Sequence, residues 1–176
     1  ASLWLTSYAE MEPLFKRHGA VKIVGAHDAL SAKLIERAGF DGVWASGFAI
    51  SASLKCIPDA SFIDSSEQLG VERRMAEAIN IPIVADCDTG YGNALNVMRT
   101  VNDRERAGVA AICIEDNVYP KRCSFYAGVK RELIPIEEHC GKIKAAKAAQ
   151  TVPDFMIIAR TEALIAGWGK EEALKR

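Results

Sequence analysis

Short apolar segments alternate with helical segments along the chain, and this alternation restricts the fold more than any other feature. The segments with the length and content of buried strands are residues 21–26, 42–47, 83–85, 110–114 and 155–159. Helices are expected over residues 11–17 at the N-terminus, then over 29–38, 67–79, 95–107 and 136–149, and from about residue 170 onward. Alternating strands and helices favour a parallel sheet built from right-handed strand–helix units.

Two α/β architectures accommodate about five such units. One is a complete doubly wound sheet, and the other is the first part of a (β/α)8 TIM barrel, which typically takes about 250 residues. The last six residues look like a helix cut in mid-run, because they contain neither a capping glycine nor a stop signal. We therefore expect the N-terminal portion of a TIM barrel, forming a single domain over residues 1–176.

Composition argues against several classes of function. The net charge of −1 gives no general attraction to nucleic acid or to an anionic membrane. No apolar run approaches the length of a membrane span, and the first residues lack the basic and apolar blocks of a secretory signal. The five cysteines form no C-x-x-C pair and no zinc-binding spacing. We therefore expect a cytoplasmic protein with free thiols.

Two carboxylates follow the third apolar segment, in the stretch Pro-Ile-Val-Ala-Asp-Cys-Asp-Thr-Gly-Tyr-Gly-Asn over residues 82–93. Asp86 and Asp88 should point the same way, because alternate side chains on a strand share a face. Burying two like charges side by side is costly unless a cation lies between them, and Mg2+ or Mn2+ suits paired carboxylates. The alternative is a solvated turn rich in Asp and Gly.

Polar residues also gather at the carboxyl ends of the other strands, where parallel α/β folds build their sites. Glu115 ends the fourth strand, Asp59 lies in the connection after the second, and Arg160 and Glu162 follow the fifth. Carboxylates at successive strand ends strengthen the metal hypothesis. Arg160 either neutralises these carboxylates, with Glu162 as its partner, or clamps a carboxylate or phosphoryl oxygen of a ligand.

Two further stretches, residues 46–48 and the connection after residue 117, are candidates for a substrate site, and Trp44 lies close to the first of them in the sequence. Residues 46–48, Ser-Gly-Phe, can present backbone N–H groups to an anion, because glycine permits close approach. Trp44 is expected to pack at its strand position. The long connection from 118 to about 133 contains Lys121 and Cys123, which are either solvated or part of a lid that brings a cation or an acidic thiol to the site.

The chain resembles the phosphoenolpyruvate mutase/isocitrate lyase superfamily from about Val21 to its end. The matching stretches, in one-letter code, are AHDALSAK (26–33), WASGF (44–48), PDA (58–60), DCDTGYGN (86–93), ED (115–116), PK (120–121) and IARTEA (158–163). The resemblance implies a (β/α)8 barrel, commonly a homotetramer. It also implies small anionic 2-oxo or enol acid substrates, whose chemistry passes through a metal-stabilised enolate.

The resemblance also implies roles for individual residues. Mg2+, with Mn2+ possible, would be held directly or through water by Asp86, Asp88 and Glu115, with Asp59 nearby. The substrate set would be Trp44, Ser46, Gly47, Phe48 and Arg160, with the backbone of residues 46–48 holding the substrate carboxylate. The catalytic set would be Asp59, Lys121, Cys123 and Arg160.

Two branches of the superfamily compete. The stretches at residues 44–48 and 163–169 look like the phosphonate branch. Mutases of that branch usually carry Glu-Asp-Lys, then five residues, then Asn-Ser. This chain has Glu115-Asp116-Asn117 and Cys123-Ser124 at these positions, so Asn117 and Cys123 depart from the mutase pattern. Lys121-Arg122-Cys123 resembles the lyase branch, whose expected Gly-His does not follow. We expect a phosphoenolpyruvate mutase that forms phosphonopyruvate. The alternatives are a C–C lyase or oxaloacetate decarboxylase with Cys123 as acid, a phosphonopyruvate hydrolase, and an inactive fragment.

Overall fold

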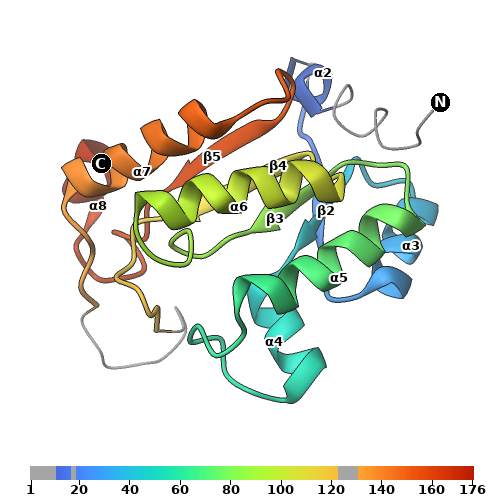
Figure 1. The fold of residues 1–176 in the computed structure, drawn as a ribbon, viewed down its shortest axis with the longest axis horizontal. Helices are drawn as coiled ribbons and strands as arrows, with labels where there is room; N and C mark the ends of the chain where they lie inside the picture. Colours follow the sequence, from blue (N-terminus) through green and yellow to red (C-terminus); the bar gives the residue numbers. More distant parts are fainter. Residues whose placement is uncertain (1–10, 17–18, 123–130) are drawn as a thin grey trace.

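A single parallel sheet forms the centre of the computed structural model, which describes residues 11–16, 19–122 and 131–176 (Figure 1). Its strands are β1 (Ile23–Ala26), β2 (Gly42–Ala45), β3 (Ile83–Asp86), β4 (Ala111–Glu115) and β5 (Met156–Arg160). They are hydrogen-bonded in the order β1-β2-β3-β4-β5, and each neighbouring pair is parallel. A barrel adds its strands in chain order, whereas a doubly wound sheet reverses that order at a switch point. The expected portion of a barrel is confirmed, and the doubly wound alternative is wrong.

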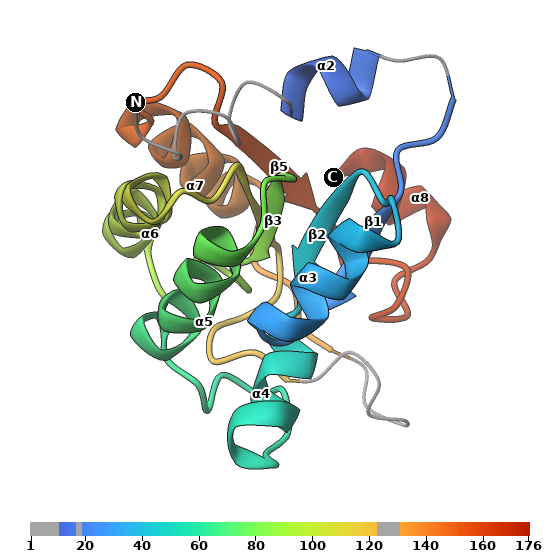
Figure 2. The same ribbon diagram turned by 90° about the vertical axis from the view of Figure 1, so that its right-hand side faces the viewer.

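Helices flank the sheet, of which the first packs against one face and those between the strands cover the other. They are α2 (Met11–Lys16), α3 (Ala29–Arg37), α4 (Gly47–Lys55), α5 (Ser65–Ala78), α6 (Ala94–Ala107), α7 (Ile136–Ala149) and α8 (Lys170–Lys175). The pairs α3–α5, α5–α6 and α6–α7 pack side by side along this face (Figures 1 and 2). Capping boxes at Asp64 and Asn93 fix the starts of α5 and α6. The predicted helix over residues 11–17 is observed as α2, with residue 17 outside the described part.

Helix α4 corrects the expectation of a long connection over residues 48–65. It begins at Gly47, where the side chain of Ser46 caps the N–H of Ala49 at 3.3 Å, and it ends at Cys56 in the left-handed region with φ 53°. Serine is a favoured N-cap residue, and the Ala-containing segment that follows contains no proline. The true connection is therefore residues 56–64. The correction matters because it places a helix N-terminus directly after β2.

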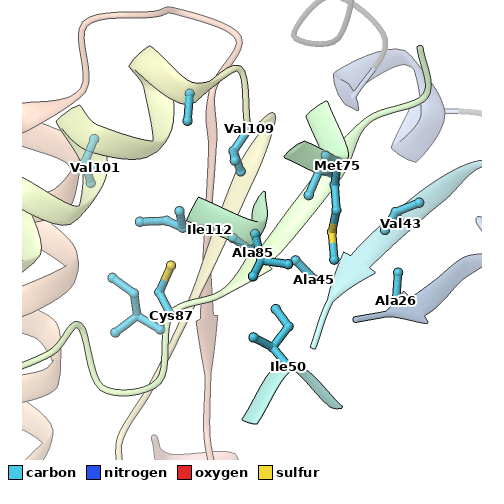
Figure 3. Close-up of a cluster of buried hydrophobic side chains, with 14 of the residues drawn as sticks. Ala26, Val43, Ala45, Ile50, Met75, Ala85, Cys87, Val101, Val109 and Ile112 are labelled. Atoms are coloured by element: carbon cyan, nitrogen blue, oxygen red, sulfur yellow. The ribbon is translucent and has the colours of Figure 1, made fainter. Parts of the chain in front are cut away.

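The two faces of the sheet bury different apolar clusters. The larger cluster lies between the sheet and its helices, where Met75 of α5 and Ile50 of α4 pack over alternate strand residues, including Ala26, Val43, Ala45, Ala85 and Ile112 (Figure 3). The smaller cluster is on the opposite face and contains Met11 of α2, Val84, Ala110 and Ala111, with Ile23, Trp44, Met156 and Ile158 packed against it. None of the described helices is long and apolar enough to cross a membrane.

Candidate active site

The candidate site lies where the face opposite the helices reaches the carboxyl ends of the strands. Strand register places Asp86 beside Cys113 and Glu115 beside Arg160, all on the face that carries Val84. Asp88 follows two residues after the end of β3 and still joins the ladder, because the N–H of Glu115 donates to its carbonyl oxygen at 2.8 Å. Three strand ends therefore contribute charged side chains to one rim.

Asp86 and Asp88 approach the same point at Gly47, the first residue of α4. A Cβ atom on Gly47 would lie 3.4 Å from Oδ2 of Asp86 and 3.5 Å from Oδ1 of Asp88. The expectation that the two carboxylates point the same way is thus confirmed, although Asp88 has φ 48° and its position comes from a turn rather than from strand geometry. The solvated-turn alternative is wrong, because both side chains are buried.

Lys121 lies inside this rim. Its Nζ is 3.0 Å from Oδ2 of Asp59 and also forms an ion pair with Oδ1 of Asp88. Its backbone N–H donates to the Ser61 hydroxyl at 3.0 Å, which joins the segment before residue 122 to the connection between α4 and α5. Only 5% of the side chain is exposed, so the alternative that Lys121 is a solvated loop residue is wrong. Cys123 lies outside the described residues.

Arg160 pairs with two carboxylates at the ends of β4 and β5. Its Nε donates to Oε1 of Glu162 at 2.8 Å and lies 3.6 Å from Oε2 of Glu115. The side-chain amide of Asn117 donates to Oε1 of Glu115 at 2.7 Å. The neutralising role of Arg160 is therefore observed. With 36% of its side chain exposed, the guanidinium also keeps a surface on which an anion can bind.

Burial controls the protonation of these groups. Burial raises the pKa of Asp88 to about 7, against the opposing effect of the Lys121 ammonium. Burial also raises the pKa of Glu115, and Lys121 again opposes the change. For Lys121, burial favours the neutral amine, but Asp88, Asp86 and Glu115 outweigh it, so the pKa of its ammonium is raised. The rim holds more negative charge than its lysine and arginine neutralise.

The donor set fits a hard divalent cation. Asp86, Asp88 and Glu115 offer only oxygen, and a bound cation would supply the missing positive charge. Within the described residues, no group of three His, Cys, Asp or Glu side chains forms a ready-made ligand cage. Mg2+ usually keeps several waters and binds through one or two carboxylates, so these residues suit Mg2+ that is held partly through water. The binding of Mg2+ by Asp86, Asp88 and Glu115, directly or through water, stays a prediction.

The predicted anion site at residues 46–48 coincides with the N-terminus of α4. The first N–H groups of a helix have no intrahelical partner and attract anions, which leaves Gly47 and Phe48 to supply them. The N–H of Ser46 already donates to the carbonyl of Ala26 at 3.1 Å, so Ser46 contributes as the helix cap. The phenyl ring of Phe48 is exposed. Trp44 packs against the cluster around Met11, as expected for a strand position.

Several buried polar residues near the rim are absent from the predicted set. Arg104 of α6 forms an ion pair with Glu72 of α5. Gln68 donates to the carbonyl of Asp86 at the end of β3, and Lys142 donates to the carbonyl of Thr89 in the turn that follows. One signal was visible for Arg104, which shares a helix face with Val97 and Val101 at spacings of four and three residues. Nothing in the sequence distinguishes Gln68 or Lys142 from solvated residues.

Parallel strands with charged side chains gathered at their carboxyl ends define the class of barrel-type enzymes. The family model described as phosphoenolpyruvate phosphomutase matches residues 11–176, and the chain belongs to this family. Phosphonopyruvate hydrolase from Variovorax sp. (strain Pal2) is 49% identical over 87% of this chain and 52% of its own length. 2,3-dimethylmalate lyase from Eubacterium barkeri is 45% identical over 98% of this chain and 58% of its own length. The chain thus spans about half the length of the curated relatives it matches.

Solved structures agree with this assignment. A phosphoenolpyruvate phosphomutase from Streptomyces platensis subsp. rosaceus superposes with a TM-score of 0.93 and 55% identity, covering 96% of this chain and 58% of that one. A phosphonopyruvate hydrolase in complex with oxalate and Mg2+ superposes with a TM-score of 0.84 and 42% identity, and the match covers 99% of this chain and 58% of that one. The predicted membership of the phosphoenolpyruvate mutase/isocitrate lyase superfamily is confirmed, and its members include a mutase, a hydrolase and a lyase.

Proposed function

We propose that this protein is a Mg2+-dependent phosphoenolpyruvate mutase that interconverts phosphoenolpyruvate and phosphonopyruvate. The observation that carries the proposal is the buried ammonium of Lys121 between Asp59 and Asp88, at the rim where Asp86 and Glu115 also end. A cation in that place suits a phosphoryl group in transit. The 55% identity to a solved phosphoenolpyruvate phosphomutase supports the same assignment.

Each part of a small anionic enol acid has a partner at this site. The carboxylate would bind the N–H groups of Gly47 and Phe48 at the start of α4. The exposed part of the Arg160 guanidinium would bind further negative charge. Asp86, Asp88 and Glu115 would hold Mg2+, or Mn2+ in its place. When bound, the metal supplies a Lewis acid for the enolate oxygen.

The reaction moves a phosphoryl group between two atoms of one substrate. The P–O bond of phosphoenolpyruvate breaks, and a P–C bond forms at C3 of the pyruvate enolate, so no atom or electron is gained or lost. Lys121 would neutralise the phosphoryl oxygens during the transfer, while Asp59 orients Lys121 and guides the group. Water must be excluded, since it would capture the phosphoryl group. The stretch containing Lys121 and Cys123 is our candidate for that barrier.

Phosphonopyruvate hydrolase is the second candidate function, because a curated hydrolase is 49% identical over most of this chain. The same residues would bind the same substrate, and water would take the phosphoryl group. C–C lyase chemistry is a third outcome, in which Cys123 protonates the enolate. In each case we expect cytoplasmic small-molecule chemistry by a homo-oligomer, a tetramer at full length, without a nucleic-acid or membrane partner.

Phosphorus NMR of phosphonopyruvate incubated with the protein and Mg2+ separates these functions. Phosphoenolpyruvate as the product supports the mutase, and inorganic phosphate supports the hydrolase. If phosphonopyruvate is unchanged, cleavage of methylisocitrate or decarboxylation of oxaloacetate would identify a lyase, and inertness toward all three would identify an inactive fragment. Asp59→Asn should abolish mutase turnover. Asp154→Asn should leave turnover unchanged, because Asp154 is exposed and precedes the amino end of β5, whereas the site lies at the carboxyl ends of the strands.

A further inference from the structure

The turn that carries the two aspartates has an unusual backbone. Asp88 and Tyr91 take positive φ angles of 48° and 59°, and Gly90 and Gly92 take 83° and 143°. A residue with a side chain is strained in the left-handed region, because its Cβ atom crowds the following carbonyl oxygen. Such a conformation persists only where the surrounding structure holds it. The contacts around this turn therefore decide where the carboxylates of Asp86 and Asp88 point.

Three neighbouring helices each send one polar side chain to the turn from the side of the main core. Gln68 of α5 donates its amide to the carbonyl of Asp86, and Lys142 of α7 donates to the carbonyl of Thr89 at 3.1 Å. Arg104 of α6 donates to the Tyr91 hydroxyl at 3.3 Å, and its guanidinium lies 5.2 Å from the centre of that ring. All three side chains are buried.

These contacts are a costly way to stabilise a fold. The ammonium of Lys142 has the Thr89 carbonyl as a close partner, while Oε1 of Glu138 is 3.9 Å away, and burial lowers the pKa of Lys142. Arg104 is fully buried in an ion pair with Glu72 at 3.1 Å. Replacing buried charges with apolar side chains of similar volume is often neutral or stabilising. Stability alone therefore gives little reason for charged groups in these places.

We propose that Gln68, Arg104 and Lys142 are positioning residues that hold the turn after β3 so that Asp86 and Asp88 present their carboxylates together at the rim. The inference rests on the proposed metal-dependent function. Its chemical basis is that each donor fixes a backbone or hydroxyl oxygen within five residues of a carboxylate. Groups that orient metal ligands typically contribute a factor of about 10 to 100 to metal affinity.

Lys142→Met provides the sharpest test, because methionine matches the lysine side chain as far as Cε and removes the ammonium group that donates. Lys144→Met is the matched control, since Lys144 is exposed on the same helix. Isothermal titration should show that Lys142→Met binds Mg2+ and Mn2+ about 10- to 100-fold more weakly, with a metal-free melting temperature within a few degrees of the unmodified protein. Excess Mg2+ should restore the turnover rate. Gln68→Met, on a different helix, should weaken binding in the same direction.

Hydrogen exchange provides a readout that is independent of the metal. The N–H of Gly90 donates to the carbonyl of Cys87 at 2.8 Å within the turn. Its exchange should become at least about tenfold faster in Lys142→Met and remain unchanged in Lys144→Met. Unchanged exchange, or faster exchange with unchanged affinity, would overturn the positioning role. If the unmodified protein binds neither ion, the proposed function is wrong, and so is the inference that rests on it, whereas normal binding with unaffected variants refutes the inference alone.

Discussion

Replacing Arg104 with methionine tests whether the buried ion pair between α5 and α6 is needed for stability. Arg104 and Glu72 are both fully buried, and Nε of Arg104 lies 3.1 Å from Oε2 of Glu72. The guanidinium also donates to the Ser65 hydroxyl at 2.6 Å and to the Tyr91 hydroxyl at 3.3 Å. Methionine fills much of the volume but leaves the Glu72 carboxylate in an apolar environment without its countercharge.

The expected loss in free energy of unfolding is about 3 to 5 kcal/mol, the usual cost of removing one partner of a buried pair. For a chain of this size the loss corresponds to a fall of roughly 6 to 20 °C in melting temperature. The loss should depend on pH. Burial raises the pKa of Glu72 and Arg104 opposes the change, so removing Arg104 should raise this pKa further. A carboxyl with a raised pKa in the folded state favours folding at low pH, so the loss should be smaller near pH 5 than near pH 8.

Urea unfolding followed by circular dichroism measures these differences. The double variant Arg104→Met with Glu72→Met should recover much of the loss, since no buried charge remains uncompensated. Arg99→Met is the control on the same helix, because Arg99 is 80% exposed and its pair with Asp103 should contribute at most about 1 kcal/mol. A loss below about 1 kcal/mol for Arg104→Met, or a double variant as unstable as the sum of its parts, would refute the reasoning.

Three further predictions concern the rim and its turn. Because burial raises the pKa of Asp88 to about 7, Mg2+ affinity measured by calorimetry should fall by about tenfold per pH unit below that value, and a flat profile would contradict it. Gly90→Ala should lower the free energy of unfolding in urea by about 2 to 4 kcal/mol. Gly90 has a φ angle of 83°, which strains alanine, and the added Cβ would overlap the side chain of Val97 in α6. Its control, Gly70→Ala, has open space within α5 and should gain about 0.5 to 1 kcal/mol; equal effects would contradict the prediction. Lys121→Met should lower mutase turnover by at least about 100-fold in the phosphorus NMR assay, whereas Lys55→Met, at an exposed lysine, should leave turnover unchanged. A loss under about tenfold for Lys121→Met would argue against a role of Lys121 in phosphoryl transfer.

The architecture was predictable because each strand is a short apolar run and most of the segments between strands have the apolar spacing of a helix. The convergence of Asp86, Asp88 and Glu115 was predictable for a related reason, since parallel strands bring their carboxyl ends to one edge. These are local patterns combined with a general topological rule. They required no knowledge of how distant side chains meet.

What the sequence could not supply depends on contacts between segments far apart in the chain. The ion pairs of Lys121 with Asp59 and Asp88 join residues 62 and 33 positions apart, and nothing local to Lys121 distinguishes it from a solvated lysine. Lys142 reaches the turn across 53 residues. The missed helix α4 is a different case, because a favoured N-cap residue, Ser46, stands in the sequence directly before it and could have indicated its start.

The division of the sheet face opposite the helices has an evolutionary consequence. The amino-terminal half of this face carries the apolar cluster around Met11, Val84 and Ala111, and its carboxyl-terminal half carries the charged groups. Because the apolar cluster and the charged residues occupy opposite ends of the same strands, new reactions can arise by exchanging the charged residues without rebuilding the apolar cluster. A scaffold divided in this way can diversify its chemistry with few substitutions, in keeping with relatives that are named as a phosphomutase, a hydrolase and a lyase.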